Sequence, residues 1–70
     1  MEISIREDEN YITLGQAMKK AGLSASGVEA KMAINDGLVT VNGEVELRRG
    51  RKLYNGDEFS YEGESVKVIK

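Results

Sequence analysis

Four cationic side chains occur within five residues, at Arg48-Arg49-Gly50-Arg51-Lys52. Because a guanidinium group is a planar fork that matches a pair of phosphate oxygens, three arginines in this run indicate a phosphate-binding surface. Successive side chains of a strand alternate between faces, so we expect Gly50 to bend the chain and let several cations point the same way. The spacing is equally consistent with a solvated basic face whose charges pair with Glu44, Glu46 or Glu58.

The formal net charge of the 70-residue chain is −2, but the charge is unevenly distributed. Residues 19–52 carry seven lysines and arginines against four acidic residues, whereas both ends of the chain are acidic. A polyanionic partner would therefore be expected to bind residues 19–52. Because a nearby carboxylate weakens the field that attracts phosphates, this hypothesis requires Glu44 and Glu46 to point away or to lie at the rim.

The chain contains neither cysteine nor histidine. Disulfides, thiolate metal sites, the commonest zinc ligand and the commonest general base are therefore missing, and no pair of acidic residues is placed for acid–base work. We expect no enzymatic activity, no cofactor and no metal site. No stretch approaches the about 18 apolar residues typical of a membrane span, and the acidic N-terminus does not resemble a signal peptide, so a cytoplasmic location is expected.

Two helices are predicted in the first half of the chain, after a short strand at residues 2–5 and a loop at 6–10. Thr13 and Gln16 have the spacing of a capping box, and the same spacing recurs at Ser26 and Glu29. The first helix has one apolar stripe and ends at Gly22. The second is expected to end near Gly37. These are the apolar residues of the two helices: Leu14, Ala17, Met18 and Ala21, then Val28, Ala30, Met32, Ala33 and Ile34.

From Leu38 the apolar residues alternate with polar ones around Asn42-Gly43, the dipeptide best suited to a tight hairpin turn. Val39, Val41, Val45 and Leu47 are the apolar residues of the predicted hairpin. Further turns at residues 55–57 and 62–63 separate two more strands. The sequence therefore predicts a single α+β domain over residues 1–70, in which a helix pair packs on a small antiparallel sheet.

In order along the chain, residues 26–31, 35–44, 48–53 and 55–57 resemble the RNA-binding domain named after small-subunit ribosomal protein four, also called the αL motif. The resemblance covers roughly residues 12–61. The Arg-Arg-Gly-Arg-Lys-Leu run at 48–53 is similar, more narrowly, to stand-alone bacterial members of the YbcJ-like or YaaA-like kind. Two positions depart from the family pattern: Gly15, where many members have aspartate, and Gly27, where many have arginine.

The resemblance implies that the second helix, the loop before it and the following hairpin form a surface for structured RNA, with ribosomal RNA or a ribosome-associated assembly as the natural partner. Carried over by position, the implied RNA-binding residues are Ser26, Lys31, Asn42, Arg48, Arg49, Arg51 and Lys52. Recognition of shape and backbone is expected, with little reading of bases.

Some of these residues also have purely structural explanations. Ser26 is a natural helix cap and Asn42 a natural turn residue, while Lys31 could pair with Glu29 or Asp36. The four aromatic residues could stack on bases, but in so small a domain we expect them to pack in the core; they are Tyr11, Tyr54, Phe59 and Tyr61.

The alternative from a different functional class is a small protein-interaction module of ubiquitin-like size. Sulfur carriers of that kind end in Gly-Gly, whereas this sequence ends in Val68-Ile69-Lys70, which disfavours the carrier version. Copurification of nucleic acid with the protein distinguishes the two hypotheses.

Overall fold

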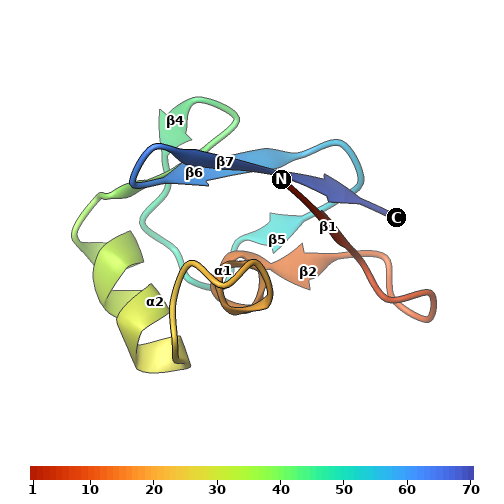
Figure 1. The fold of residues 1–70 in the computed structure, drawn as a ribbon, viewed down its shortest axis with the longest axis horizontal. Helices are drawn as coiled ribbons and strands as arrows, with labels where there is room; N and C mark the ends of the chain where they lie inside the picture. Colours follow the sequence, from red (N-terminus) through yellow and green to blue (C-terminus); the bar gives the residue numbers. More distant parts are fainter.

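A computed structural model describes residues 1–70. The strands and helices, in chain order, are β1 (Glu2–Ser4), β2 (Ile12–Thr13), α1 (Leu14–Lys20), α2 (Gly27–Asn35), β3 (Val39–Val41), β4 (Glu44–Val45), β5 (Lys52–Leu53), β6 (Glu58–Tyr61) and β7 (Glu64–Ile69). Figure 1 shows both helices on one side of the larger sheet, which confirms the predicted α+β arrangement. Neither helix has the length and apolar character needed to cross a membrane.

The five-stranded sheet has the order β1-β7-β6-β3-β4, and β2 and β5 form a separate two-stranded sheet. The larger sheet is mixed, because β1 lies parallel to β7 while its other pairs are antiparallel. The expected all-antiparallel sheet is therefore wrong at this one pair. A parallel pair must be joined by a crossover, which here spans the helices and the hairpin, so local patterns could not reveal it.

One hydrophobic core lies between the helices and the sheet. Leu14, Ala17 and Met18 of α1 meet Ala30, Ala33 and Ile34 of α2, and all are buried. The inward faces of the strands complete the core with Ile3, Ile5, Val39, Val41, Leu53, Phe59, Val66 and Val68. Val28 and Met32, two of the apolar residues of α2, are exposed and lie outside this core.

The helix starts follow the predicted caps. The Thr13 side chain accepts a hydrogen bond from the Gln16 backbone N–H, and the Gln16 side chain accepts one from the Thr13 N–H, so the first capping box is complete. At α2 only half of the box forms: Ser26 Oγ accepts from the Glu29 N–H at 3.2 Å. Each cap satisfies a backbone donor that the first helical turn leaves free.

The hairpin between β3 and β4 turns at Asn42 and Gly43, whose φ angles of 51° and 87° are those of the predicted tight turn. A two-residue turn pairs Val41 with Glu44 and Thr40 with Val45, so Val45 shares the outward face of Thr40. One pair further along, the Glu46 N–H donates to the Val39 carbonyl at 3.0 Å. Glu46 therefore lies on the core side of the hairpin.

This register corrects the expected hairpin face. Val45 and Leu47, predicted beside Val39 and Val41, are 59% and 57% exposed, while Glu46 is only 7% exposed. Direct cross-strand partners point to the same face of a sheet, so the inward valines of β3 require the even-numbered residues after the turn to face inward.

Candidate functional site

Residues 48–52, which carry the four cations, are called the basic loop from here on. Their backbone leads from β4 into β5, of which Lys52 is the first residue. The Arg51 N–H donates to the Arg48 carbonyl at 3.2 Å, which closes a turn at Gly50 as predicted. The carbonyls of Arg49 and Arg51 accept hydrogen bonds from the first N–H groups of α1, those of Gly15 at 3.0 Å and Leu14 at 2.8 Å. In Figure 1 the chain accordingly runs from β4 down to α1 before it enters β5.

The pairing of β2 with β5 continues this attachment. Thr13, the cap of α1, lies opposite Lys52, and Ile12 lies opposite the buried Leu53. The helix start and the basic loop are therefore one structural unit. Nothing in the local sequence pattern around residues 12–13 indicated this pairing.

Gly15 makes the close contact between α1 and the basic loop possible. A Cβ atom built at this glycine would lie 2.7 Å from Cγ of Arg49 and 3.6 Å from the Arg49 carbonyl oxygen. Real Cβ contacts are not that short, so the missing side chain gives the stem of Arg49 room to cross the helix. The departure of this chain from the family pattern at Gly15 thus has a structural explanation.

Glu46 binds two arginines of the basic loop. Its Oε2 accepts hydrogen bonds from Arg48 Nε at 2.9 Å and from the Arg48 backbone N–H at 3.0 Å. Its Oε1 accepts from Arg51 Nη1 at 2.7 Å and from Arg48 Nη2 at 3.2 Å. These are charge-assisted contacts, of which the pair of bonds from the Arg48 side chain is bidentate.

The same contacts set the charge of Glu46. Hydrogen bonds from Arg48 and then Arg51 lower the pKa of the Glu46 carboxyl from 4.5 to about 2, against a weaker upward effect of burial. The hydrogen bond to Glu46 in turn raises the pKa of Arg48. The carboxylate is therefore ionised at neutral pH and holds both guanidinium groups in place.

The requirement that Glu46 point away from the basic run is contradicted, because this carboxylate lies between Arg48 and Arg51. The alternative reading, in which an acidic residue of the hairpin pairs with the run, is correct for these two arginines. One carboxylate cannot neutralise four cations, however. Arg49 and Lys52 make no ion pair, and the side chain of Arg48 remains 73% exposed.

An open hollow of about 600 Å³ lies against the basic loop. It is lined by Arg48, Gly50, Arg51, Lys52 and Tyr54, with no carboxylate among them. Three of the predicted cations therefore meet at one concavity. Such a surface attracts an anion and offers an aromatic ring beside it.

The aromatic residues divide in a way that the sequence analysis missed. Phe59 is fully buried and Tyr61 packs partly against the core, as expected. Tyr54 is 49% exposed, so its predicted place in the core is wrong. Its ring lies 5.9 Å from that of Tyr11, at an interplanar angle of 53°, and Lys52 Nζ lies 4.9 Å from the centre of the Tyr11 ring. The alternation of side chains along an extended chain indicated the exposure of Tyr54, because Leu53 faces inward and the next residue must face outward.

Asn42 is held by the next turn of the chain. Its side-chain amide donates to Asp57 Oδ1 at 3.1 Å and accepts from the Glu58 N–H at 3.0 Å. Asn42 also borders a second hollow, of about 450 Å³, that Arg48 and Arg51 share. The turn and these two hydrogen bonds therefore account for an asparagine at position 42 without a contact to RNA, although Asn42 lies near the basic loop.

Ser26 caps α2 and Lys31 belongs to it, and neither residue lines these hollows. Lys31 is exposed and forms no ion pair with Glu29 or Asp36. The alternative in which Lys31 pairs with Glu29 or Asp36 is therefore not realised. A shared face for Lys31 and the basic loop stays a prediction.

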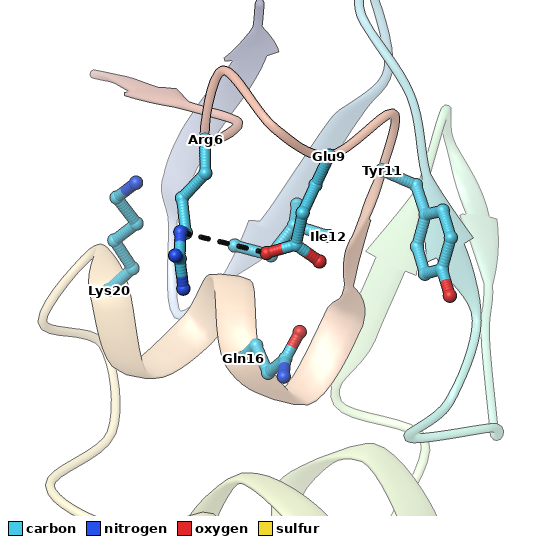
Figure 2. Close-up of a pocket in the computed structure, with 6 residues that line it drawn as sticks. All are labelled: Arg6, Glu9, Tyr11, Ile12, Gln16 and Lys20. Carbon is cyan, nitrogen blue, oxygen red and sulfur yellow. Dashed lines mark ion pairs between the residues drawn. The ribbon is translucent and has the colours of Figure 1, made fainter.

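A further pocket, of about 250 Å³, lies beside α1 and is shown in Figure 2. Its cations are engaged within the protein. Arg6 Nε lies 3.8 Å from Glu9 Oε1 and 3.4 Å from Asp8 Oδ1, and the ammonium group of Lys20 donates to the Ser4 carbonyl. Both cations of this pocket are therefore already bonded within the protein, Arg6 to acidic side chains and Lys20 to a backbone carbonyl.

Residues 3–69 match the S4 domain family. The chain belongs to this family. The S4 domain is 48% identical over 56 residues to the probable ribosome maturation protein RlbA of Bacillus subtilis, covering 80% of this chain and 79% of that protein. It is 41% identical over 59 residues to the putative RNA-binding protein YbcJ of Escherichia coli, covering 84% of each.

The solution structure of YbcJ from Escherichia coli matches the fold of this S4 domain. The TM-score is 0.75 at 36% identity, and the match covers 99% of this chain and 86% of the YbcJ chain. That structure was described as revealing an αL motif involved in RNA binding. The family resemblance drawn from residues 26–57 is therefore confirmed.

Proposed function

We propose that the protein is a non-catalytic binder of structured RNA, with the basic loop as the centre of its contact surface. The single observation that carries the proposal is the hollow bordered by Arg48, Arg51 and Lys52 on a backbone fixed to α1. Because the cations are positioned before a ligand arrives, less conformational entropy is lost when phosphates bind.

Family membership supports the same conclusion, since one relative is named a putative RNA-binding protein and another a probable ribosome maturation protein. Ribosomal RNA, or a precursor assembly that contains it, is the RNA we propose. The domain, residues 1–70, would act there alone or as one part of the assembly, in the cytoplasm. Lys31 and the N-terminus of α2 at Ser26 would extend the contact surface to a neighbouring phosphate.

A salt titration with a ribosomal RNA stem-loop tests this proposal. If about four phosphates are engaged, log affinity should fall against log salt concentration with a slope of about −3 to −4. A variant with Arg48, Arg49 and Arg51 changed to glutamine should lose most of this slope. This variant should also contain Glu46→Gln, because Glu46 would otherwise lose both of its arginine partners. The single variant Glu46→Gln is the matched control.

Undetectable affinity at low salt would falsify the proposal, as would an unchanged slope in a folded variant that lacks the three arginines. A protein-interaction module predicts such an outcome, because its affinity for RNA would not depend on the basic loop.

A further inference from the structure

We propose that the hollow beside Tyr54 binds one unpaired nucleotide of the RNA. The base would stack on the Tyr54 ring, and the adjoining phosphate would contact Arg51 and Lys52. This inference rests on the proposed RNA binding and narrows its ligand to a structured RNA with a bulged or looped-out nucleotide beside a helix. It adds base stacking to a surface that was expected to recognise mainly the shape and backbone of the RNA.

The exposure of Tyr54 is the first observation. A tyrosine ring buries a large apolar area when it can, and Phe59 and Tyr61 do so here. Tyr54 instead leaves 49% of its surface open, directly after the buried Leu53. An exposed ring that lines a cationic hollow has the composition of sites where bases stack beside a phosphate contact.

Tyr54 is also held in position. Its backbone N–H donates to Asp57 Oδ2 at 2.7 Å, and its carbonyl accepts from the Asp57 N–H at 3.0 Å. The tilted contact with Tyr11 supports the ring from one side, and Lys52 in turn lies over Tyr11. Such a fixed platform loses little side-chain entropy when a base stacks on it.

The charges of the hollow suit a nucleotide better than a free base. Arg51 and Lys52 lie in the same lining as Tyr54, and no carboxylate does. Two carboxylates border the site, and both are already bonded: Glu46 to Arg48 and Arg51, and Asp57 to the Tyr54 backbone N–H. A phosphate and a base joined by one ribose can therefore meet cations and an aromatic ring together.

The RNA must supply an unpaired base, because a base within a continuous helix is covered on both faces by its neighbours. Stacking on a protein ring therefore requires a bulge, a loop or an end. Since every base has an aromatic face, the site should tolerate different bases. The expected ligand is defined by an unpaired position more than by a sequence.

Two blunt-ended RNA duplexes without loops test the inference, one uninterrupted and one with a single-nucleotide bulge. The native protein should bind the bulged RNA more tightly. Tyr54→Leu should weaken this binding by about 5- to 160-fold, which corresponds to the about 1–3 kcal/mol lost when alanine replaces an aromatic residue that stacks on a base. The Tyr54→Phe variant is the matched control and should retain the preference, because phenylalanine keeps the ring.

Fluorescence gives a second measurement. The chain contains three tyrosines and no tryptophan, so a variant with Tyr11→Phe and Tyr61→Phe has Tyr54 as its sole emitter. Its emission should be quenched by the bulged RNA and less by the uninterrupted duplex. Absence of this difference would overturn the inference.

The two proposals fail in different ways. If neither RNA binds at low salt, RNA binding itself is wrong and the nucleotide site falls with it. If both RNAs bind with equal affinity and Tyr54→Leu has no effect on either, RNA binding stands and the nucleotide site alone is wrong.

Discussion

The turn at residues 6–10 and the basic loop are both short, exposed and rich in charge, but their charges are arranged differently. In the turn, Arg6 lies 3.4 Å from Asp8 and 3.8 Å from Glu9. The ammonium group of Lys70 donates to the Glu9 carbonyl and, at 3.3 Å, to Asn10 Oδ1. Arg6, the one cation of the turn, is thus paired within the protein, and Lys70, which lies outside the turn, is bonded to it.

In the basic loop, Arg48 and Arg51 share the single carboxylate of Glu46, and Arg49 and Lys52 have no ion-pair partner. The loop backbone is also bonded to the start of α1, whereas the turn at residues 6–10 has no such attachment to a helix. A count of charged residues does not distinguish the two segments. What distinguishes them is the positive charge that remains in the basic loop after internal pairing, on a backbone that is bonded to α1.

The largest expected effect comes from reversing one charge in each segment. Arg49→Glu should lower RNA affinity by more than about 10-fold at 0.1 M salt and reduce the salt slope by at least one unit, because a contact is lost and a repulsion gained. Arg6→Glu should change the RNA affinity by no more than about 2-fold and leave the salt slope near its native value. Filter-binding titrations at several salt concentrations measure both. Equal losses in the two variants would mean that total charge, and not the basic loop, controls binding.

Asn42→Ala tests whether the hairpin turn contributes to stability alone or also to RNA binding. The substitution removes two hydrogen bonds and places alanine at a φ of 51°, so unfolding should become easier by about 1–2 kcal/mol. The salt slope of RNA binding should stay near the native value, since no phosphate contact is lost. Urea denaturation and the salt titration test the two parts. A slope reduced by a full unit would instead make Asn42 a direct phosphate contact.

Acidification should affect the loop through Glu46. Its folded-state pKa of about 2 lies below the ordinary value of 4.5, so the stabilisation is present above about pH 4.5 and is lost as the pH falls towards 2. Because its arginine partners are partly exposed, we expect about 1 kcal/mol of unfolding free energy to change over this range. Glu46→Gln should remove this component of the pH dependence. An unchanged profile in the variant would show that Glu46 is not held by the arginines in solution.

The smallest expected effect is that of Gly15→Ala. Alanine favours a helix interior by about 1 kcal/mol over glycine, but moving the Arg49 stem away from the new Cβ costs free energy, so the free energy of unfolding should change by less than about 1 kcal/mol. The new Cβ would nevertheless displace Arg49, and RNA affinity should fall by about 2- to 5-fold. In an Arg49→Gln background the substitution should have no further effect on binding. An additive loss in the double variant would mean that Gly15 acts through something other than Arg49.

Much of the fold was predictable because its signals are local. Thr13 and Gln16 lie within one helical turn, and Asn42-Gly43 specifies its own backbone angles. The pairings of β1 with β7 and of β2 with β5 join residues far apart in sequence, so no local pattern reveals them. The inward position of Glu46 was available from the sequence, since a two-residue turn fixes which residues of the hairpin share a face.

The candidate site shows the same division. The cations of the basic loop and its bend at Gly50 were visible in the sequence. The pairing of Arg48 and Arg51 with Glu46 required the hairpin register, and the contact of Arg49 with Gly15 required the tertiary structure. Composition alone favoured a buried Tyr54, while the strand alternation after Leu53 favoured an exposed one.

The parallel pairing of β1 with β7 has a consequence for how the protein is made. The Lys67 N–H donates to the Met1 carbonyl at 2.8 Å, and the Ile5 N–H donates to the Ile69 carbonyl at 2.7 Å. Strand β1 therefore cannot pair until β7, which is synthesised about sixty residues later, is available. The helices and the β3–β4 hairpin need no such delay, because their contacts are short in sequence. During synthesis β1 stays unpaired until β7 emerges from the ribosome, so we expect the closing of this sheet edge to be the last step in the folding of this domain.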